Sequence, residues 1–304
     1  MKQTFYSNGK LLITGEYLVL DGAKALALPT KFGQSLEIIA TNKKSISWKS
    51  YDFDETCWFE TEFSFDEIIY KTVQESNSKV KNTLLEILSA AFQLNDNVLN
   101  SELGFEVTTR LSFPRNWGLG TSSTLINNIS QWFEVDAFVL LQNSFGGSGY
   151  DIACAQNNGP ILYELQNKIP KITAIDFHPI FSKNIYFVYL NQKQNSQIAI
   201  ENYRKNTDDK ESIITAIDFL TKRISTTSDF IEFEKALFLH EMLVGARLNQ
   251  TPIQQRLFSD FDGTVKSLGA WGGDFVLVVS KINPKEYFKA KGFEIILTFE
   301  EMIL

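Results

Sequence analysis

In the first third of the chain, short apolar segments alternate with turns. Gly, Asn and Asp residues separate these segments, a pattern typical of short β-strands. The expected strands are residues 5–7, 10–14, 17–20, 35–40, 45–48 and 105–111. Between them, Val80, Leu84, Leu88, Ala91 and Phe92 recur at the spacing of one helix face. The pattern predicts a largely antiparallel sheet with an amphipathic helix over one face, in a layered α+β domain.

The middle of the chain contains two helix starts rich in small residues. A glycine-rich loop, residues 118–123, leads into a segment with Leu125, Ile129 and Trp132 on one helical face. A second apolar segment, residues 137–141, is followed by glycines, and residues 148–151 then open another expected helix. Two helix N-termini therefore carry small polar side chains.

The pattern of strands and helices restarts after Pro160. Strands are expected at residues 161–165, 185–190, 275–279 and 293–298, and helices at residues 211–224 and 230–248. Asp229 and Glu232 have the spacing of a capping box at the start of the last helix. A domain boundary is expected between residues 160 and 180, dividing the chain into domains 1–170 and 171–304.

Composition and charge narrow the function classes. The chain has 304 residues, 44% of them hydrophobic, and its 29 Lys and Arg against 36 Asp and Glu give a formal charge of -7. Because the basic residues are scattered, nucleic acid is not an expected partner. An acidic protein that handles anionic substrates needs a local positive site made from a few side chains and backbone amides.

The termini and cysteines indicate the compartment. Cys57 and Cys154 lie far apart without a C-x-x-C pairing, which predicts reduced thiols. The first residues lack an apolar signal core, and no apolar run approaches the ~20 residues of a membrane helix. We therefore expect a cytoplasmic enzyme or binding protein without a membrane partner.

The loop at residues 118–123 is the first candidate site. Glycines let backbone N–H groups approach an anion, and the helix that follows adds the positive end of its dipole. The alternative is a tight strand-to-helix connection with a Ser or Thr cap. The Rossmann pattern fails at Ser123, and the G-x-x-x-x-G-K-[ST] loop occurs nowhere in the chain. Only His178 and His240 are available, which argues against His-based triads and His-rich metal sites.

Three further features are ambiguous when taken singly. Asp151 at a helix start either caps the helix or accepts a proton from a substrate hydroxyl. Lys10 and Glu16 bracket an apolar strand and form either a solvated surface pair or part of a site. The cluster at residues 267–274 is either a structural turn or a place where backbone approaches a ligand closely.

The order of these features resembles the superfamily of galactokinase, homoserine kinase, mevalonate kinase and phosphomevalonate kinase, called the GHMP kinases. The resemblance spans essentially the whole chain. It rests on residues 9–20 for the first motif, residues 114–124 for the phosphate loop and residues 266–274 for the third motif. The family fold implies an N-terminal α+β domain with a ribosomal-S5-like half and a ferredoxin-like C-terminal domain.

The resemblance also implies an activity, transfer of the ATP γ-phosphate to a small molecule, and roles for matching residues. Asp151 would be the catalytic carboxylate, and Lys10 would lie near it, favouring its ionisation and offsetting charge on the transferred phosphate. Ser122 would help to hold Mg²⁺. The residues expected to bind ATP are Gly118, Leu119, Gly120, Thr121, Ser122 and Ser123, and those expected near the substrate are Glu16, Ser148, Gly149, Gly269, Ala270, Gly272 and Gly273.

Motif details favour the isoprenoid branch of the family. Gly15-Glu16-Tyr17 resembles phosphomevalonate kinases, whereas Ser148-Gly149-Tyr150-Asp151 is closer to mevalonate kinases. The expected acceptor is therefore mevalonate or phosphomevalonate. The alternatives are a noncatalytic ligand-binding protein, a kinase for a sugar or homoserine, and a mevalonate diphosphate decarboxylase. A monomer and a homodimer are both compatible with the sequence.

Three features depart from the family pattern. Thr121 replaces a serine that is usual in the phosphate loop. Trp271 stands where the third motif has glycine, which would place an indole where a ligand otherwise packs. Mevalonate kinases supply a metal-binding glutamate upstream of the catalytic Asp, but residues 136–151 contain none. Asp136 or Gln142 could substitute for it.

Overall fold

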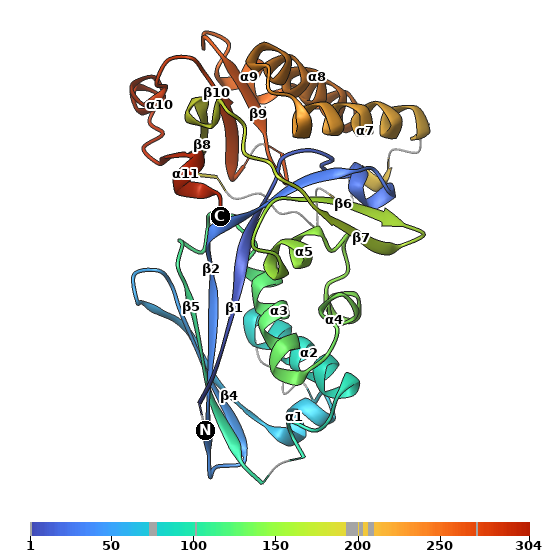
Figure 1. Cartoon of the computed structure of the whole chain (residues 1–304). Coiled ribbons are helices and arrows are strands. Elements are labelled where there is room, and N and C mark those ends of the chain that lie inside the picture. The colour runs from blue at the N-terminus through green and yellow to red at the C-terminus, as the bar shows by residue number, and fades with distance from the viewer. Residues whose placement is uncertain are drawn as a thin grey trace. The chain divides into compact units, whose positions relative to one another are not determined.

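The chain divides into two compact units, and neither is a single stretch of sequence. The computed structural model describes residues 2–72, 78–100, 102–192, 200, 203–205, 210–271 and 273–304. The first unit comprises Met1–Gly9, Phe32–Arg115 and Leu119–Gln156, and the second comprises Lys10–Lys31, Asn116–Gly118 and Asn157–Leu304. Figure 1 shows the chain coloured along its sequence.

The first unit is a sheet with helices over one face (Figure 1). Its strand order is β4-β3-β5-β2, with β1 also paired to β2, and the β3–β5 pair is parallel whereas β2–β5 and β3–β4 are antiparallel. The prediction of a largely antiparallel sheet within an α+β fold is confirmed. The strands are β1 (Lys2–Leu12) and β2 (Ala25–Thr41), whose residues 10–12 and 25–31 belong to the second unit, with β3 (Ser45–Tyr51), β4 (Cys57–Ser64) and β5 (Gly104–Leu111). The helices are α1 (Phe65–Ile69), α2 (Lys79–Leu94), α3 (Thr121–Phe133), α4 (Ala137–Ser144) and α5 (Tyr150–Gln156).

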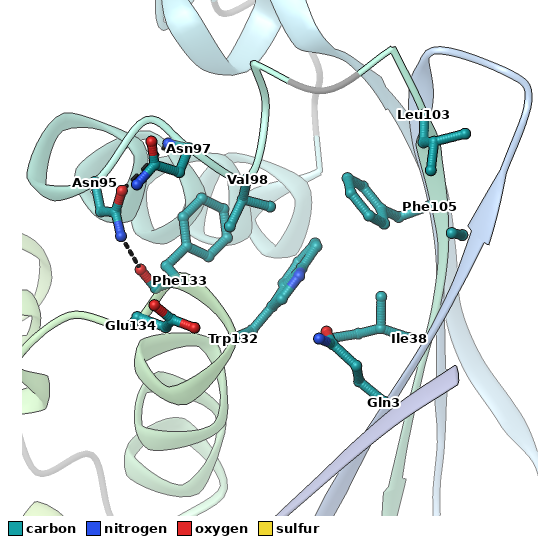
Figure 2. A pocket seen from close by; sticks show the side chains of 11 residues that line it. Gln3, Ile38, Asn95, Asn97, Val98, Leu103, Phe105, Trp132, Phe133 and Glu134 are labelled. Carbon is teal, nitrogen blue, oxygen red and sulfur yellow. Dashed lines mark hydrogen bonds between the residues drawn. The ribbon is translucent and has the colours of Figure 1, made fainter. Parts of the chain in front are cut away.

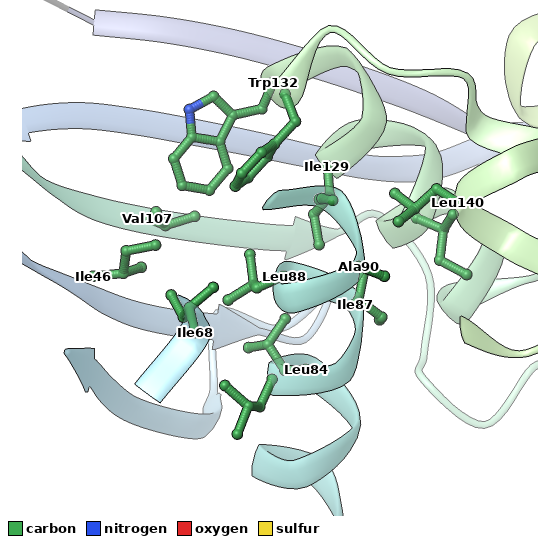
Figure 3. Packing of buried hydrophobic residues seen from close by; sticks show 14 of the residues in the cluster. Ile46, Ile68, Leu84, Ile87, Leu88, Ala90, Val107, Ile129, Trp132 and Leu140 are labelled. Carbon is green, nitrogen blue, oxygen red and sulfur yellow. The ribbon is translucent and has the colours of Figure 1, made fainter. Parts of the chain in front are cut away.

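The core of the first unit lies between these helices and the sheet. In Figure 3 the apolar face of α2, with Leu84 and Leu88, points toward the strand residues Ile46 and Val107. These side chains are almost completely buried, and each such burial stabilises the fold by ~1.5–3 kcal/mol. Ser78 caps α2 by accepting a hydrogen bond from the Lys81 backbone N–H. The helix predicted from the apolar spacing is therefore present and faces the core.

The second unit contains a four-stranded antiparallel sheet in the order β11-β8-β10-β9. Helices α7 and α8 lie side by side (Figure 1), and α8 packs on β9. Strand β6 pairs with the first residues of β2 and with β7. The elements are η1 (Leu18–Asp21), β6 (Ile161–Gln166), β7 (Ile169–Ala174), η2 (Ser182–Asn184), β8 (Ile185–Tyr189), α7 (Glu211–Thr226), α8 (Phe230–Leu248), α9 (Ile253–Leu257), β9 (Thr264–Ser267), β10 (Phe275–Val279), α10 (Lys285–Ala290), β11 (Ile296–Thr298) and α11 (Phe299–Met302).

The two long helices predicted for the second half of the chain are both present. Asp229 caps α8 by accepting the Glu232 backbone N–H at 2.9 Å, as the spacing predicts, but the Glu232 side chain instead accepts a hydrogen bond from Thr227. Within the described ranges, no helix has the length and apolar character of a bilayer-spanning segment.

Two predictions of local structure were wrong. Residues 17–20 are not a strand, because Tyr17 has a left-handed backbone (φ 62°) and starts the 3-10 helix η1. Residues 5–7 and 10–14 are not separate strands, because β1 is continuous from Lys2 to Leu12. Ser7, predicted in the strand at residues 5–7, does lie in β1, and its buried hydroxyl donates to Asn128 Oδ1 at 2.7 Å. The pattern also missed β4, β7 and β9 and the short helices α1, α9, α10 and α11.

Candidate active site

The N-terminus of α3, in the first unit, presents free backbone donors. Gly120 precedes the helix with φ 96° and, as a glycine, supplies no side-chain cap to the first turn. The backbone N–H groups of residues 121–123 have no carbonyl partner within the helix, since the first such bond runs from Thr124 N–H to Gly120 O. The Ser123 hydroxyl turns back to Gly120 O at 2.8 Å, whereas Ser122 is exposed. This end of α3 is therefore suited to bind an anion.

A buried polar network fixes α3 against the sheet. The Ser7 hydroxyl donates to Asn128 Oδ1 at 2.7 Å and accepts from Asn127 Nδ2 at 2.9 Å. Asn128 Nδ2 donates to Gln34 O at 3.0 Å, and the Thr124 hydroxyl donates to Gln34 Oε1 at 2.7 Å. Because these buried groups satisfy one another, they set the rotation of α3 about its axis and hold its first turn in place.

Asp151 lies in the first turn of α5, which packs on α3 within the same unit. Gln156, at the other end of α5, donates to Asn127 Oδ1 at 3.0 Å, so α5 contacts the middle of α3. Because α5 is about 10 Å long, Asp151 lies no more than about 10 Å along the helix axis from this contact. Ser148 and Gly149 precede Asp151 and are buried, with Gly149 at φ 87°.

In the second unit, two charged residues converge on Gly118. Lys10 Nζ donates to Gly118 O at 2.9 Å. The Asp274 carboxylate packs on the other side of the same residue so closely that a Cβ at Gly118 would lie 2.0 Å from Asp274 Oδ2. Gly118 also has φ 69°, so both its backbone and its surroundings require glycine. A cation and a carboxylate are thus held at the first glycine of the predicted phosphate loop.

The third motif forms the loop between β9 and β10. Gly269 has φ 55°, the Ala270 carbonyl accepts a hydrogen bond from Tyr17 Oη at 2.9 Å, and Gly273 is buried. Gly272 lies outside the described residues. The structure places the Trp271 side chain in a hydrophobic cluster with residues of η1 and α8.

A buried ionic cluster joins the first and third motifs. Glu16 Oε1 accepts from Lys266 Nζ, and both side chains are completely buried. Burial raises the pKa of Glu16 to about 7, although Lys266 acts in the opposite direction. The sequence placed Glu16 near the substrate, and the structure places it at the centre of this cluster.

Helix α8 supplies the other members of the cluster. His240 Nε2 accepts the Gly15 backbone N–H at 3.0 Å and lies 3.6 Å from Glu16 Oε2. Burial, reinforced by Lys266, lowers the pKa of His240 well below its usual value, so the imidazole is neutral. Burial raises the pKa of Glu241, which accepts from the Ser267 backbone N–H and hydroxyl. Sequence reasoning missed Lys266, His240 and Glu241 because nothing local to a residue signals a buried charge.

A cavity of about 360 Å³ in the first unit is separate from the predicted site residues. Figure 2 shows it beside the end of α3, with Trp132 and Phe133 on one side and Ile38 and Phe105 of the sheet on the other. Gln3, Asn95, Asn97 and Glu134 add polar groups to its lining. None of the residues predicted from the motifs lines this cavity.

A Mg²⁺ ion carried by a phosphate ligand would need few protein ligands at this end of α3. Across the described ranges, His, Cys, Asp and Glu side chains form no group of three that could hold a metal. Mg²⁺ characteristically binds through few protein ligands, with phosphate oxygens and water completing its shell. The exposed hydroxyl of Ser122, beside the free N–H groups of α3, suits such an ion.

Comparison with known proteins identifies the fold. No protein-family model matches the chain, and no curated protein matches its sequence. Solved structures match over nearly the whole length, and they include mevalonate kinase, phosphomevalonate kinase and galactokinase, which are GHMP kinases. The chain therefore has the two-domain GHMP kinase fold, as the motif order led us to expect.

Three of these structures show the range of the similarity. Methanococcus jannaschii mevalonate kinase is 19% identical, with a TM-score of 0.70 over 96% of this chain and 95% of that one. Streptococcus pneumoniae phosphomevalonate kinase in complex with phosphomevalonate and AMPPNP is 16% identical, with a TM-score of 0.71 over 97% and 99%. Lactococcus lactis galactokinase complexed with galactose is 13% identical, with a TM-score of 0.65 over 95% and 88%.

Proposed function

We propose that the protein is an ATP-dependent kinase that transfers the γ-phosphate to mevalonate or phosphomevalonate. The observation that carries the proposal is the N-terminus of α3, where three free backbone N–H groups follow a left-handed Gly120 in a fold shared with kinases. The motif details that favour the isoprenoid branch and the match to a phosphomevalonate kinase complexed with AMPPNP support this acceptor and this nucleotide.

Binding and orientation fall to the loop at residues 118–123. The N–H groups of residues 121–123 would donate to phosphate oxygens, and Ser122 would hold Mg²⁺, which neutralises phosphate charge. Lys10, fixed by its hydrogen bond to Gly118 O, would place a positive charge at the transferred phosphate. Positioning and charge stabilisation supply most of the rate enhancement in phosphoryl transfer.

Asp151 would act on the acceptor. Its carboxylate would accept the proton of the acceptor hydroxyl as that oxygen attacks phosphorus. The packing of α5 on α3, fixed by the Gln156–Asn127 hydrogen bond, keeps Asp151 in a constant relation to the first turn of α3 within the same unit. General-base catalysis of this kind contributes ~10²–10⁴-fold to the rate.

The test is ADP release from ATP and Mg²⁺ with mevalonate, phosphomevalonate, galactose and homoserine as acceptors. We expect turnover with mevalonate or phosphomevalonate and a loss of ~10²-fold or more in Asp151→Asn. Asp54→Asn, a substitution in an exposed turn of the same unit, is the matched control and should retain activity. Turnover only with galactose or homoserine would reject the proposed acceptor. Nucleotide binding without turnover of any acceptor would reject catalysis.

A further inference from the structure

The Trp271 side chain fills a recess on helix α8 in the second unit. The indole is 4% exposed and packs in one cluster with Tyr17, Leu18 and Val244. The recess exists because residue 245 is glycine: a Cβ there would lie 2.9 Å from Trp271 Cη2 and 3.4 Å from Cζ3. Gly245 lies in the last turn of α8, where glycine has a lower helix propensity than alanine, so its presence opposite the indole indicates a fitted pair.

The backbone around Trp271 is held in a conformation that a bulky residue rarely adopts. Trp271 has φ 57°, in the left-handed region, and so does Tyr17 with φ 62°. Such conformations persist only where the surroundings impose them. Tyr17 Oη donates to Ala270 O at 2.9 Å, and Trp271 N–H donates to Leu268 O at 3.2 Å. Side chain and backbone thus fix the same point of the loop between β9 and β10.

The indole contributes apolar bulk and no side-chain hydrogen bond. Trp271 Nε1 is buried and has no hydrogen-bond partner among the residues that the structure describes. Leaving a buried donor unsatisfied is unfavourable, so an aromatic ring without the N–H donor should fill the recess beside Gly245 equally well. Phe is therefore the conservative replacement, and Gly, the residue that the family pattern has here, removes the anchor.

The loop that Trp271 anchors ends at Asp274, whose carboxylate packs on Gly118. The two ends of the loop are fixed by pairing of β9 with β10, where Val276 lies opposite Ser267. Between these ends, the contact of the Trp271 indole with Gly245 fixes the middle of the loop. We propose that Trp271 is a positioning residue, which holds the third motif so that Asp274 keeps Gly118 and the Lys10 hydrogen bond in place for nucleotide phosphates. This inference rests on the proposed kinase function.

The experiment compares Trp271→Gly, Trp271→Phe, Gly245→Ala and the double variant Trp271→Gly/Gly245→Ala. The readouts are the KM for ATP, kcat, and hydrogen exchange of the backbone amides of residues 264–271. Gly245→Ala adds a Cβ that displaces the indole without deleting it. Because Ala favours helices more than Gly does, a loss of function in this variant comes from the displaced indole and not from a weaker helix. A Cβ at residue 245 would also lie close to Gln250 O. The double variant lacks the indole, so it shows how much of the Gly245→Ala effect comes from Gln250 and how much from Trp271.

We expect Trp271→Gly and Gly245→Ala each to raise the KM for ATP about tenfold, to change kcat little and to speed exchange in residues 264–271. Trp271→Phe should stay within about twofold of the wild type, and the double variant should be no worse than Trp271→Gly. Unchanged exchange and KM in Trp271→Gly and Gly245→Ala would overturn the inference. So would a Gly245→Ala effect that persists undiminished in the Trp271→Gly background.

Failure of the proposed function gives a different result. A wild-type protein that neither binds ATP nor releases ADP would reject the kinase, whatever the variants do. The exchange measurement needs no nucleotide, so it still decides the structural part: faster exchange in both single variants supports anchoring by Trp271, and unchanged exchange overturns it.

Discussion

The buried carboxyl of Glu16 makes the stability of the protein depend on pH in a defined direction. Glu16 is completely buried beside Lys266, and burial raises its pKa from the usual 4.5 to about 7. Between these two pH values the folded chain holds a proton that the unfolded chain has released. The stabilisation from this proton is therefore fully present below pH 4.5 and lost as the pH rises to 7.

The size of the effect follows from the width of this window. At about 1.4 kcal/mol per pH unit, ionisation of Glu16 removes about 3 kcal/mol from the free energy of unfolding. His240 opposes this trend: because its pKa is lowered in the fold, the unfolded chain takes up a proton first as the pH falls below 6.5. The effect of Glu16 is therefore seen in a comparison with Glu16→Gln, which cannot ionise.

The assay is urea denaturation of the wild type and Glu16→Gln at several pH values from 4 to 8, followed by circular dichroism. The free energy of unfolding of the variant minus that of the wild type should rise by about 3 kcal/mol between pH 4.5 and 7. Glu286→Gln, a change to an exposed carboxylate in the same unit, is the control, since it loses little hydration on folding. A difference that stays level or falls with pH would refute the reasoning, because attraction to Lys266 would then outweigh burial.

Two further substitutions test the surroundings of Gly118. Gly118→Ala should lower kcat/KM for ATP by about tenfold or more, because its Cβ would displace Asp274, whereas Gly146→Ala, with a similar φ of 67° and open space around it, carries only the ~1–2 kcal/mol backbone cost. Lys10→Met should reduce kcat by ~10²-fold, because it removes the cation hydrogen-bonded to Gly118 O, while Lys2→Met on the same strand should leave steady-state kinetics unchanged.

Helices with a clear apolar face were predictable from the sequence. The segments around Leu84, Ile129 and Leu237 repeat apolar residues at helical spacing, and each is a helix with that face buried. The glycine-rich loop before α3 was also predictable, because glycine followed by an amphipathic segment is a local signal. Such local signals are strongest in a helix or strand that buries only one of its faces in the hydrophobic core.

Features that depend on distant partners were not predictable. The strand at Ser7 was predicted, but the burial of its hydroxyl was not, because the partners Asn127 and Asn128 lie about 120 positions later in the chain. Lys266 resembles a surface lysine until Glu16, 250 positions away, pairs with it. The turn at Tyr17 resembles a strand because aromatic and β-branched residues favour strands, and only tertiary packing imposes its left-handed backbone.

The most direct test of the account is a crystal structure with a nonhydrolysable ATP analogue, Mg²⁺ and phosphomevalonate. The account predicts triphosphate oxygens within hydrogen-bond distance of the backbone N–H groups of residues 121–123, Lys10 near the terminal phosphate, and an acceptor oxygen about 3 Å from the Asp151 carboxylate. A triphosphate bound away from residues 118–123 would contradict it.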